Sequence, residues 1–206
     1  MPVTAASRKR VYATSMKKIT YLLTALVIVT GLGCASQSEK SNSAYPDAYR
    51  EALSDFPGDR TVEEETINEF TQFLMSLGQP GAAATARELY AEELHFSDAL
   101  MHTRDREKVV THFDGLGKAG TTVNVEMHQT LVSGADVYLV WSMRATFKPI
   151  IRTVESDTLG ITHLRFNEQG QVVLHQDFWD SGLGFYSHVP FLGGVVRAVN
   201  KRFQAE

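Results

Sequence analysis

Apolar residues recur at helical spacing in the first part of the chain and alternate with polar residues in the later part. The apolar positions of residues 67–77 predict a helix that ends at Gly78, and Thr61 with Glu64 ahead of it forms a capping-box pattern. Two further helices are predicted over about residues 82–91 and 105–116, with a short strand at 94–98 between them.

The later part of the chain predicts a sheet. Period-two alternation indicates strands over about 123–127, 137–143, 160–166 and 171–179, the last two joined by a turn at Asn167–Gly170. Helices followed by an antiparallel sheet indicate an α+β fold. After Pro190, a C-terminal helix has Leu192, Val195, Val199 and Phe203 on one side. This helix packs on its own domain or lies against a membrane surface or a partner.

The N-terminal segment has the order of a signal peptide. Lys17 and Lys18 precede an apolar run from Ile19 to Gly33, which is shorter than the roughly 20 residues that a membrane-spanning helix needs. Gly31-Leu32-Gly33-Cys34 resembles the lipobox of bacterial lipoproteins, in which the cysteine is acylated after cleavage. We therefore expect residues 1–33 to be a leader, starting at Met1 or Met16, and Cys34 to carry a lipid.

A polar tether and a collar are expected between the lipid and the domain. Residues 36–43 are polar and serine-rich, which is typical of a flexible tether. Residues 44–60 have near-helical apolar spacing interrupted by Pro46 and Pro57, so a short helix or collar is predicted there. The domain itself is expected over residues 61–206. By resemblance to enterobacterial lipoproteins, Ala35 after the cysteine favours a periplasm-facing position at the outer membrane of the cell envelope.

Net charge argues against nucleic acid as a partner. Five of the 20 basic residues precede Cys34, whereas all 24 acidic residues follow it. The chain after the leader is therefore near −9, which opposes binding to a polyanion. The chain has one cysteine, so an intrachain disulfide is excluded.

Two stretches resemble the nuclear transport factor 2-like superfamily, which includes ketosteroid isomerase and SnoaL-like polyketide cyclases. The first is Leu89–Asp98, a Tyr-Ala-acid turn followed by a short strand and an aspartate, and the second is the hairpin Ile161–Asp180. The resemblance covers about residues 62–180. It implies a cone-shaped, curved antiparallel sheet with the three N-terminal helices in its concavity, and it makes a homodimer plausible.

The resemblance also implies part of a catalytic site. Asp98 stands where ketosteroid isomerase has its base, whereas the two oxyanion donors of that enzyme fall near Phe70 or Thr71 and at Thr162. Each missing donor costs about 3 kcal/mol of stabilisation of an enolate. Steroid-type isomerisation is therefore not expected.

Other groups could take over the chemistry. His175, Asp177 and Trp179 share one face of the last strand. A four-residue turn would place Thr162 opposite His175, and a three-residue turn would place His163 there instead. We expect Asp98, His175 and Asp177 to act as acid and base in an apolar cavity lined by Phe70, Phe96, Trp141, Thr162 and Trp179.

Each of these residues also has a purely structural interpretation. Asp98 could brace the loop after its strand, His175 and Asp177 could satisfy each other, and the tryptophans could fill the core. No cofactor or metal is expected, and a metal site at His163, His175 and Asp177 would need the three-residue turn. The sequence thus favours a membrane-tethered domain that binds a small apolar or polyketide-like ligand, with a non-catalytic dimerisation or docking module as the alternative.

Overall fold

The computed structural model describes residues 40–117, 121–150 and 152–203. The chain divides into two compact units, Met1–Ala48 and Tyr49–Glu206, and the fold described below is that of the second. The predicted signal peptide, the lipidation site Cys34 and residues 35–39 lie outside the described residues. Within the described part of the chain, no helix combines the length and the hydropathy of a membrane span.

In the described part of the chain, four helices come before most of the sheet. They are α2 (Lys40–Asp55), α3 (Glu64–Met75), α4 (Ala82–Leu89) and α5 (Arg106–Leu116). Helix α2 begins inside the segment expected to be a tether and continues past Pro46. The predicted capping box does not form, because Thr61 donates its hydroxyl to Asp59 and the N-cap residue of α3 is Glu63.

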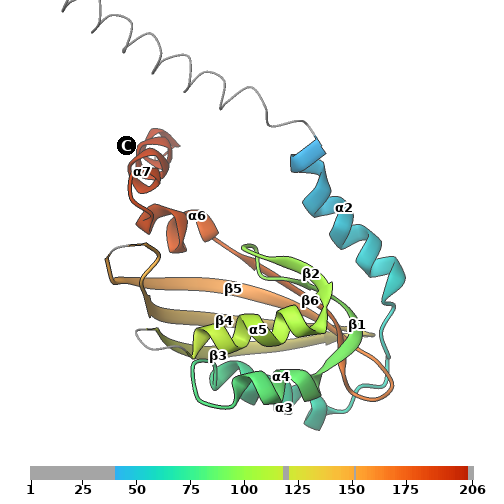
Figure 1. The fold of residues 1–206 in the computed structure, drawn as a ribbon. Coiled ribbons are helices and arrows are strands. Elements are labelled where there is room, and N and C mark those ends of the chain that lie inside the picture. Colours follow the sequence, from blue (N-terminus) through green and yellow to red (C-terminus); the bar gives the residue numbers. More distant parts are fainter. Residues whose placement is uncertain (1–39, 118–120, 151, 204–206) are drawn as a thin grey trace, which may run out of the picture. The chain divides into compact units, whose positions relative to one another are not determined.

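Six strands form one curved, open sheet in the order β2-β1-β6-β5-β4-β3 (Figure 1). Their bounds are β1 Tyr90–Ser97, β2 His102–Asp105, β3 Thr122–Ser133, β4 Asp136–Phe147, β5 Val154–Phe166 and β6 Val172–Trp179. Neighbouring strands are antiparallel except β1 and β6, which are parallel. The predicted α+β class is confirmed, and the four-residue strand β2 was not predicted.

Helices α3, α4 and α5 cover one face of the sheet and form the core with it (Figure 1). Phe70 and Phe73 of α3 contact Tyr90 of β1, and Phe73 also meets Phe113 of α5 in an edge-to-face arrangement. Such aromatic pairs add stabilisation beyond the apolar area that they bury. These aromatic side chains hold α3 and α5 on the sheet.

The hairpin between β5 and β6 has a register that neither predicted alternative gave. Thr162 pairs with Asp177, and Leu164 stands opposite His175. The ladder starts with Phe166 opposite Val172, and an irregularity next to this pair shifts the rest. The result differs from the four-residue-turn register by two positions, which leaves every side chain on its predicted face.

A polar cluster lies buried on the other face of the sheet, beneath the end of α2. His95 is 1% exposed and its Nε2 lies 3.1 Å from Oε1 of Gln176. The hydroxyl of Tyr49 lies 2.8 Å from Nδ1 of His163, whose Nε2 lies 2.8 Å from Oδ1 of Asp136. Burial lowers the pKa of His95 to about 4, and nearby cationic groups add to the shift while the Gln176 contact opposes it.

We expect the free energy of unfolding to fall as the pH drops from about 6.5 to about 4. In this window the unfolded chain binds a proton at His95 and the folded chain does not, so acid favours the unfolded state. At about 1.4 kcal/mol per pH unit over this window, the complete loss is at most about 3.5 kcal/mol. Denaturant unfolding at several pH values in this window should show that the free energy of unfolding depends less steeply on pH in His95→Gln than in the exposed control His128→Gln. Equal slopes would contradict the assignment.

The described part of the chain ends in α6 (Ser181–Gly184), η1 (Tyr186–His188) and α7 (Leu192–Phe203). The predicted C-terminal helix is present, and η1 is the described element against which it packs. Its apolar side is not buried on the domain, because Val195 is 60% and Phe203 84% exposed. The helix thus contacts its own domain, but the described residues do not bury its apolar side.

Candidate functional site

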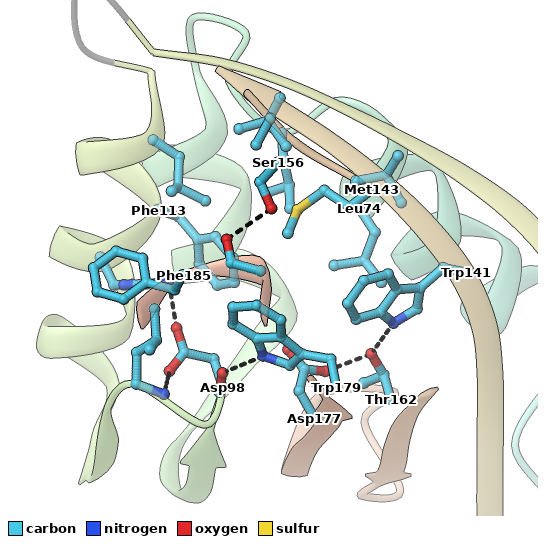
Figure 2. Close-up of a pocket in the computed structure, with 18 of the residues that line it drawn as sticks. Leu74, Asp98, Phe113, Trp141, Met143, Ser156, Thr162, Asp177, Trp179 and Phe185 are labelled. Atoms are coloured by element: carbon cyan, nitrogen blue, oxygen red, sulfur yellow. Dashed lines mark hydrogen bonds and ion pairs between the residues drawn. The ribbon is translucent and has the colours of Figure 1, made fainter. Parts of the chain in front are cut away.

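A cavity of about 260 Å³ opens between the helices and the concave face of the sheet (Figure 2). Its walls are largely apolar and come from α3, α5, all strands except β2, and α6. The side chains that line the cavity include Leu74, Phe96, Asp98, His112, Phe113, Trp141, Met143, Ala145, Thr162, His175, Asp177 and Trp179. Figure 2 shows Asp98, Asp177 and Thr162 along one side of the cavity.

Asp177 is held by a chain of hydrogen-bond donors. The Thr162 hydroxyl donates to Oδ1 of Asp177 at 2.5 Å, and the indole N–H of Trp141 donates to the Thr162 hydroxyl at 2.8 Å. Nε2 of His175 lies 3.0 Å from the same Oδ1. Among the described residues, no hydrogen bond reaches the second carboxylate oxygen, Oδ2. Asp177 therefore presents one fixed and one available oxygen to the cavity.

The direction of these bonds fixes the protonation pattern behind Asp177. A carboxylate only accepts, so His175 must donate from Nε2, and in the neutral ring Nδ1 then accepts. The Tyr90 hydroxyl, 2.8 Å from Nδ1, is the donor that fits. Burial, followed by the charges of Asp177 and Asp98, raises the pKa of Tyr90 well above its ordinary value, so the phenol keeps its proton. The group Tyr90–His175–Asp177–Thr162–Trp141 is thus fully paired at its buried end.

Gly160 makes the approach of Trp141 to Thr162 possible. Gly160 pairs with Trp141 across β5 and β4, and a Cβ at Gly160 would lie 2.3 Å from Cζ2 of Trp141. The indole therefore lies flat over the glycine and extends along β5 to the hydroxyl two residues away. Any larger residue at this position would displace the ring that starts the donor chain.

Asp98 lies in the turn after β1 and has a structural task as well as a place in the cavity. Its Oδ1 accepts the backbone N–H groups of Leu100 at 2.9 Å and Met101 at 2.6 Å, while Oδ2 lies 3.1 Å from Nε2 of His112. Ala99 has φ of 69°, an unfavourable value that this turn holds. Burial would raise the pKa of Asp98, but His112 and the two N–H groups outweigh it and lower the pKa. The carboxylate is thus kept ionised.

Replacing Asp98 by alanine is expected to lower the free energy of unfolding by about 2 kcal/mol, because two backbone donors lose their acceptor. Asparagine keeps an oxygen at Oδ1, so the loss for Asp98→Asn should stay below about 1 kcal/mol. Urea unfolding of both variants measures the difference. If the two variants lose the same stability, Asp98 does not brace the turn.

Comparison with known proteins identifies the family. Residues 70–175 match the family of SnoaL-like domains. The chain belongs to this family. No curated protein matches the chain by sequence. The confirmed α+β fold agrees with the superfamily to which Leu89–Asp98 and Ile161–Asp180 pointed.

Solved structures share the fold of this SnoaL-like domain at low identity. A protein from Jannaschia sp. CCS1, assigned as a SnoaL-like polyketide cyclase, is 15% identical with a TM-score of 0.50, over 58% of this chain and 88% of that one. TsrD from Streptomyces laurentii is 11% identical with a TM-score of 0.50, over 60% of this chain and 94% of that one. At these identities the likeness concerns the fold alone.

Most predicted site residues of the SnoaL-like domain do meet at the cavity. Asp98, His175 and Asp177 line it together with Phe96, Trp141, Thr162 and Trp179. Phe70 does not line it, because its ring lies in the core among Phe73, Tyr90, Phe166 and His175. The structural interpretation of Asp98 also holds, since this carboxylate braces its turn.

Three contributors were missed by sequence reasoning: Tyr90, His112 and Gly160. Tyr90 belongs to the quoted Tyr-Ala-acid turn but had been assigned to a helix, and it opens β1 instead. His112 lies three residues after the buried Val109 on α5, a spacing that could have marked it as facing inward. Gly160 carried no signal beyond being a glycine in a strand, which suggests close approach of another group.

The three residues considered for a metal ion do not converge. His163 lies on the outer face of the sheet beside Tyr49, whereas His175 and Asp177 face the cavity. In the described part of the chain, no group of three or more His, Cys, Asp or Glu side chains is arranged to hold a metal ion.

Proposed function

We propose that the SnoaL-like domain binds a small, mostly apolar molecule in its cavity and that Asp177 accepts a proton from it. The observation that carries this proposal is a partly buried carboxylate, held by hydrogen-bond donors, in an otherwise apolar cavity of about 260 Å³. Drug-sized pockets begin at about 300 Å³, so this volume suits a molecule of one or two rings. The polyketide cyclase assignment of the Jannaschia protein supports a polyketide-like ligand.

The arrangement suits Asp177 better than Asp98 as the base. Oδ2 of Asp177 is available to a ligand, whereas both oxygens of Asp98 already accept hydrogen bonds from Leu100, Met101 and His112. Thr162 and His175 hold the carboxylate in place, so little reorganisation is needed when a proton arrives. Asp98 with His112 then stands as a second acid–base pair at the cavity.

Native mass spectrometry of the chain purified from its own host tests the binding proposal. Ala145 lines the cavity, so Ala145→Leu fills part of it. Thr146→Leu is the control, because it places the same side chain at the next position of β4, which points to the opposite face of the sheet. We expect a bound carbon-rich molecule on the parent chain and on Thr146→Leu, with occupancy at least tenfold lower on Ala145→Leu. Equal occupancy in all three chains, or a bound mass on none, would overturn the proposal.

We further propose that an acyl group on Cys34 tethers the domain to the cell envelope on its periplasmic side, with the outer membrane favoured. The support is the leader-like segment 17–33, which ends in Gly31-Leu32-Gly33 directly before Cys34. Labelled palmitate should enter the full chain in its host and should be lost in Cys34→Ser. Equal labelling of both chains, or of neither, would contradict this attachment.

A second candidate function is dimerisation through the outer face of the sheet. Leu159 and Ile161 of β5 are 71% and 41% exposed, and Phe178 of β6 is 41% exposed. Ile161 and Phe178 pair across the two strands, so they form a continuous apolar surface. Sedimentation equilibrium should give a dimer that Ile161→Lys disrupts, and a monomer at all concentrations would exclude this function.

A further inference from the structure

Helix α7 contacts the rest of the unit through the side that carries Gly193 and Arg197, and its apolar side is a different one. Gly193 is buried against η1, where a Cβ would lie 2.0 Å from the carbonyl oxygen of Ser187. The guanidinium of Arg197, four residues on, donates to the same oxygen at 2.7 Å. Residues spaced by three and four lie on one side of a helix, so Gly193 and Arg197 define the docked edge.

The apolar side of α7 lies beside this edge and faces outward. Leu192 is 42% exposed, Val195 60%, Val199 48% and Phe203 84%. Phe191, just before the helix, is 96% exposed and has φ of 66°, so the chain holds this ring outward at some cost in backbone energy. Figure 1 shows α7 beyond α6, apart from the helices that cover the sheet. This row of five residues is called the α7 stripe below.

Charge distinguishes residues 181–203 from the acidic part of the chain that follows Cys34. Residues 181–203 contain Arg197, Lys201 and Arg202 and no acidic residue, although the chain as a whole has a net charge of −4. Lys201 and Arg202 lie in the last turn of the helix, next to the exposed Phe203. An exposed apolar side with cations along its flank is the pattern of a helix that lies in the interface of an anionic lipid surface.

We propose that α7 is a membrane-surface helix that inserts the α7 stripe into an anionic lipid bilayer. The cations of residues 181–203 complement an anionic lipid surface, whereas pairing with the same segment of a second copy would bring like charges together. The contact depends on the residues of α7 and not on acylation of Cys34 or on any ligand in the cavity. It would give the domain a second attachment point to a membrane.

Polarity-sensitive fluorescence at two positions of the full chain tests the proposal. Cys34→Ser removes the chain's one cysteine, so Val199→Cys carries a single dye on the α7 stripe. Gly194→Cys is the matched control, because a Cβ at position 194 would meet nothing within 4 Å and the introduced cysteine would point away from the α7 stripe. With vesicles of phosphatidylcholine and phosphatidylglycerol, the emission at position 199 should shift to the blue and the emission at 194 should not.

The lipid requirement supplies a second readout. Lys201→Gln with Arg202→Gln should raise the lipid concentration for a half-maximal shift about tenfold, since each cation near the surface contributes to binding. Lys108→Gln with Arg152→Gln removes the same charge from other exposed sites and should leave this concentration unchanged. The proposal is overturned if positions 194 and 199 respond alike, if neither responds, or if position 199 shifts with protein concentration in the absence of vesicles.

Discussion

Valine in place of Gly160 is expected to destabilise the domain by about 3 kcal/mol or more. The Trp141 ring occupies the space where a Cβ would lie, at 2.3 Å, and Trp141 is 5% exposed, so the ring can give way only toward the cavity that it lines. Displacing it breaks the bond from its indole N–H to Thr162 and disturbs the donor chain to Asp177. Urea unfolding measures the stability loss, and a near-ultraviolet circular dichroism spectrum reports the tryptophan environment.

Gly115→Ala is the control for this substitution. Gly115 lies in α5, and a Cβ there would meet nothing within 4 Å, so alanine should stabilise the helix by up to about 1 kcal/mol. The account requires opposite signs for the two glycines. If Gly160→Val were tolerated within about 0.5 kcal/mol, the packing of Trp141 over β5 would be wrong, and the geometry of the site with it.

Asp177→Leu is expected to cost about 3 to 5 kcal/mol of unfolding free energy. Leucine leaves the Thr162 hydroxyl and the Nε2–H of His175 without their acceptor, and His175 is 2% exposed. Losing the charged partner of buried donors is among the most costly single changes in a folded protein. Asp177→Asn keeps an acceptor oxygen at the same place, so its loss should be about 1 kcal/mol.

The asparagine variant separates stability from chemistry. If Asp177 is the base, Asp177→Asn should slow any acid–base reaction of the bound molecule by about 10² to 10⁴ while the molecule still binds. Turnover of the molecule identified on the parent chain provides the measurement, with Asp98→Asn as the comparison. A variant that folds, binds and reacts at the parent rate would show that Asp177 has only a structural role.

Local rules were sufficient to predict which face of each strand forms the site. His175 and Asp177 share a face because side chains alternate along a strand, and this held although the predicted register was off by two positions. The register itself depended on an irregularity beside Phe166, which no residue type in the turn Asn167–Gly170 announces. Side-chain direction is thus a local property of the strand, and pairing is a property of the whole hairpin.

Residues whose role depends on a distant partner could not be assigned in this way. Phe70 was predicted at the cavity because it is a large apolar residue on the first helix, but the packing of α3 directs its ring into the core behind His175. His112 has a role only because the turn at Asp98 ends within reach of α5. Each of these contacts joins elements separated in sequence, so a periodic pattern in either element alone is silent about it.

Burial of the C-terminal helix likewise depended on tertiary structure. The spacing of Leu192, Val195, Val199 and Phe203 predicted an amphipathic helix, and the helix is present. The small Gly193, together with Arg197, docks on Ser187 and turns the apolar side outward. A hydrophobic pattern shows that a surface needs a partner, and the docking contacts decide whether that partner is in the same domain.

Fluorescence energy transfer from tryptophan to a neutral apolar probe tests the central claim most directly. The chain has two tryptophans, Trp141 and Trp179, and both line the cavity. Titration with N-phenylnaphthylamine should give energy transfer that saturates at one probe per chain. The affinity for the probe should be at least tenfold lower in Ala145→Leu and unchanged in Thr146→Leu. Transfer that never saturates, or that is the same in Ala145→Leu as in the parent chain, would contradict a ligand site in this cavity.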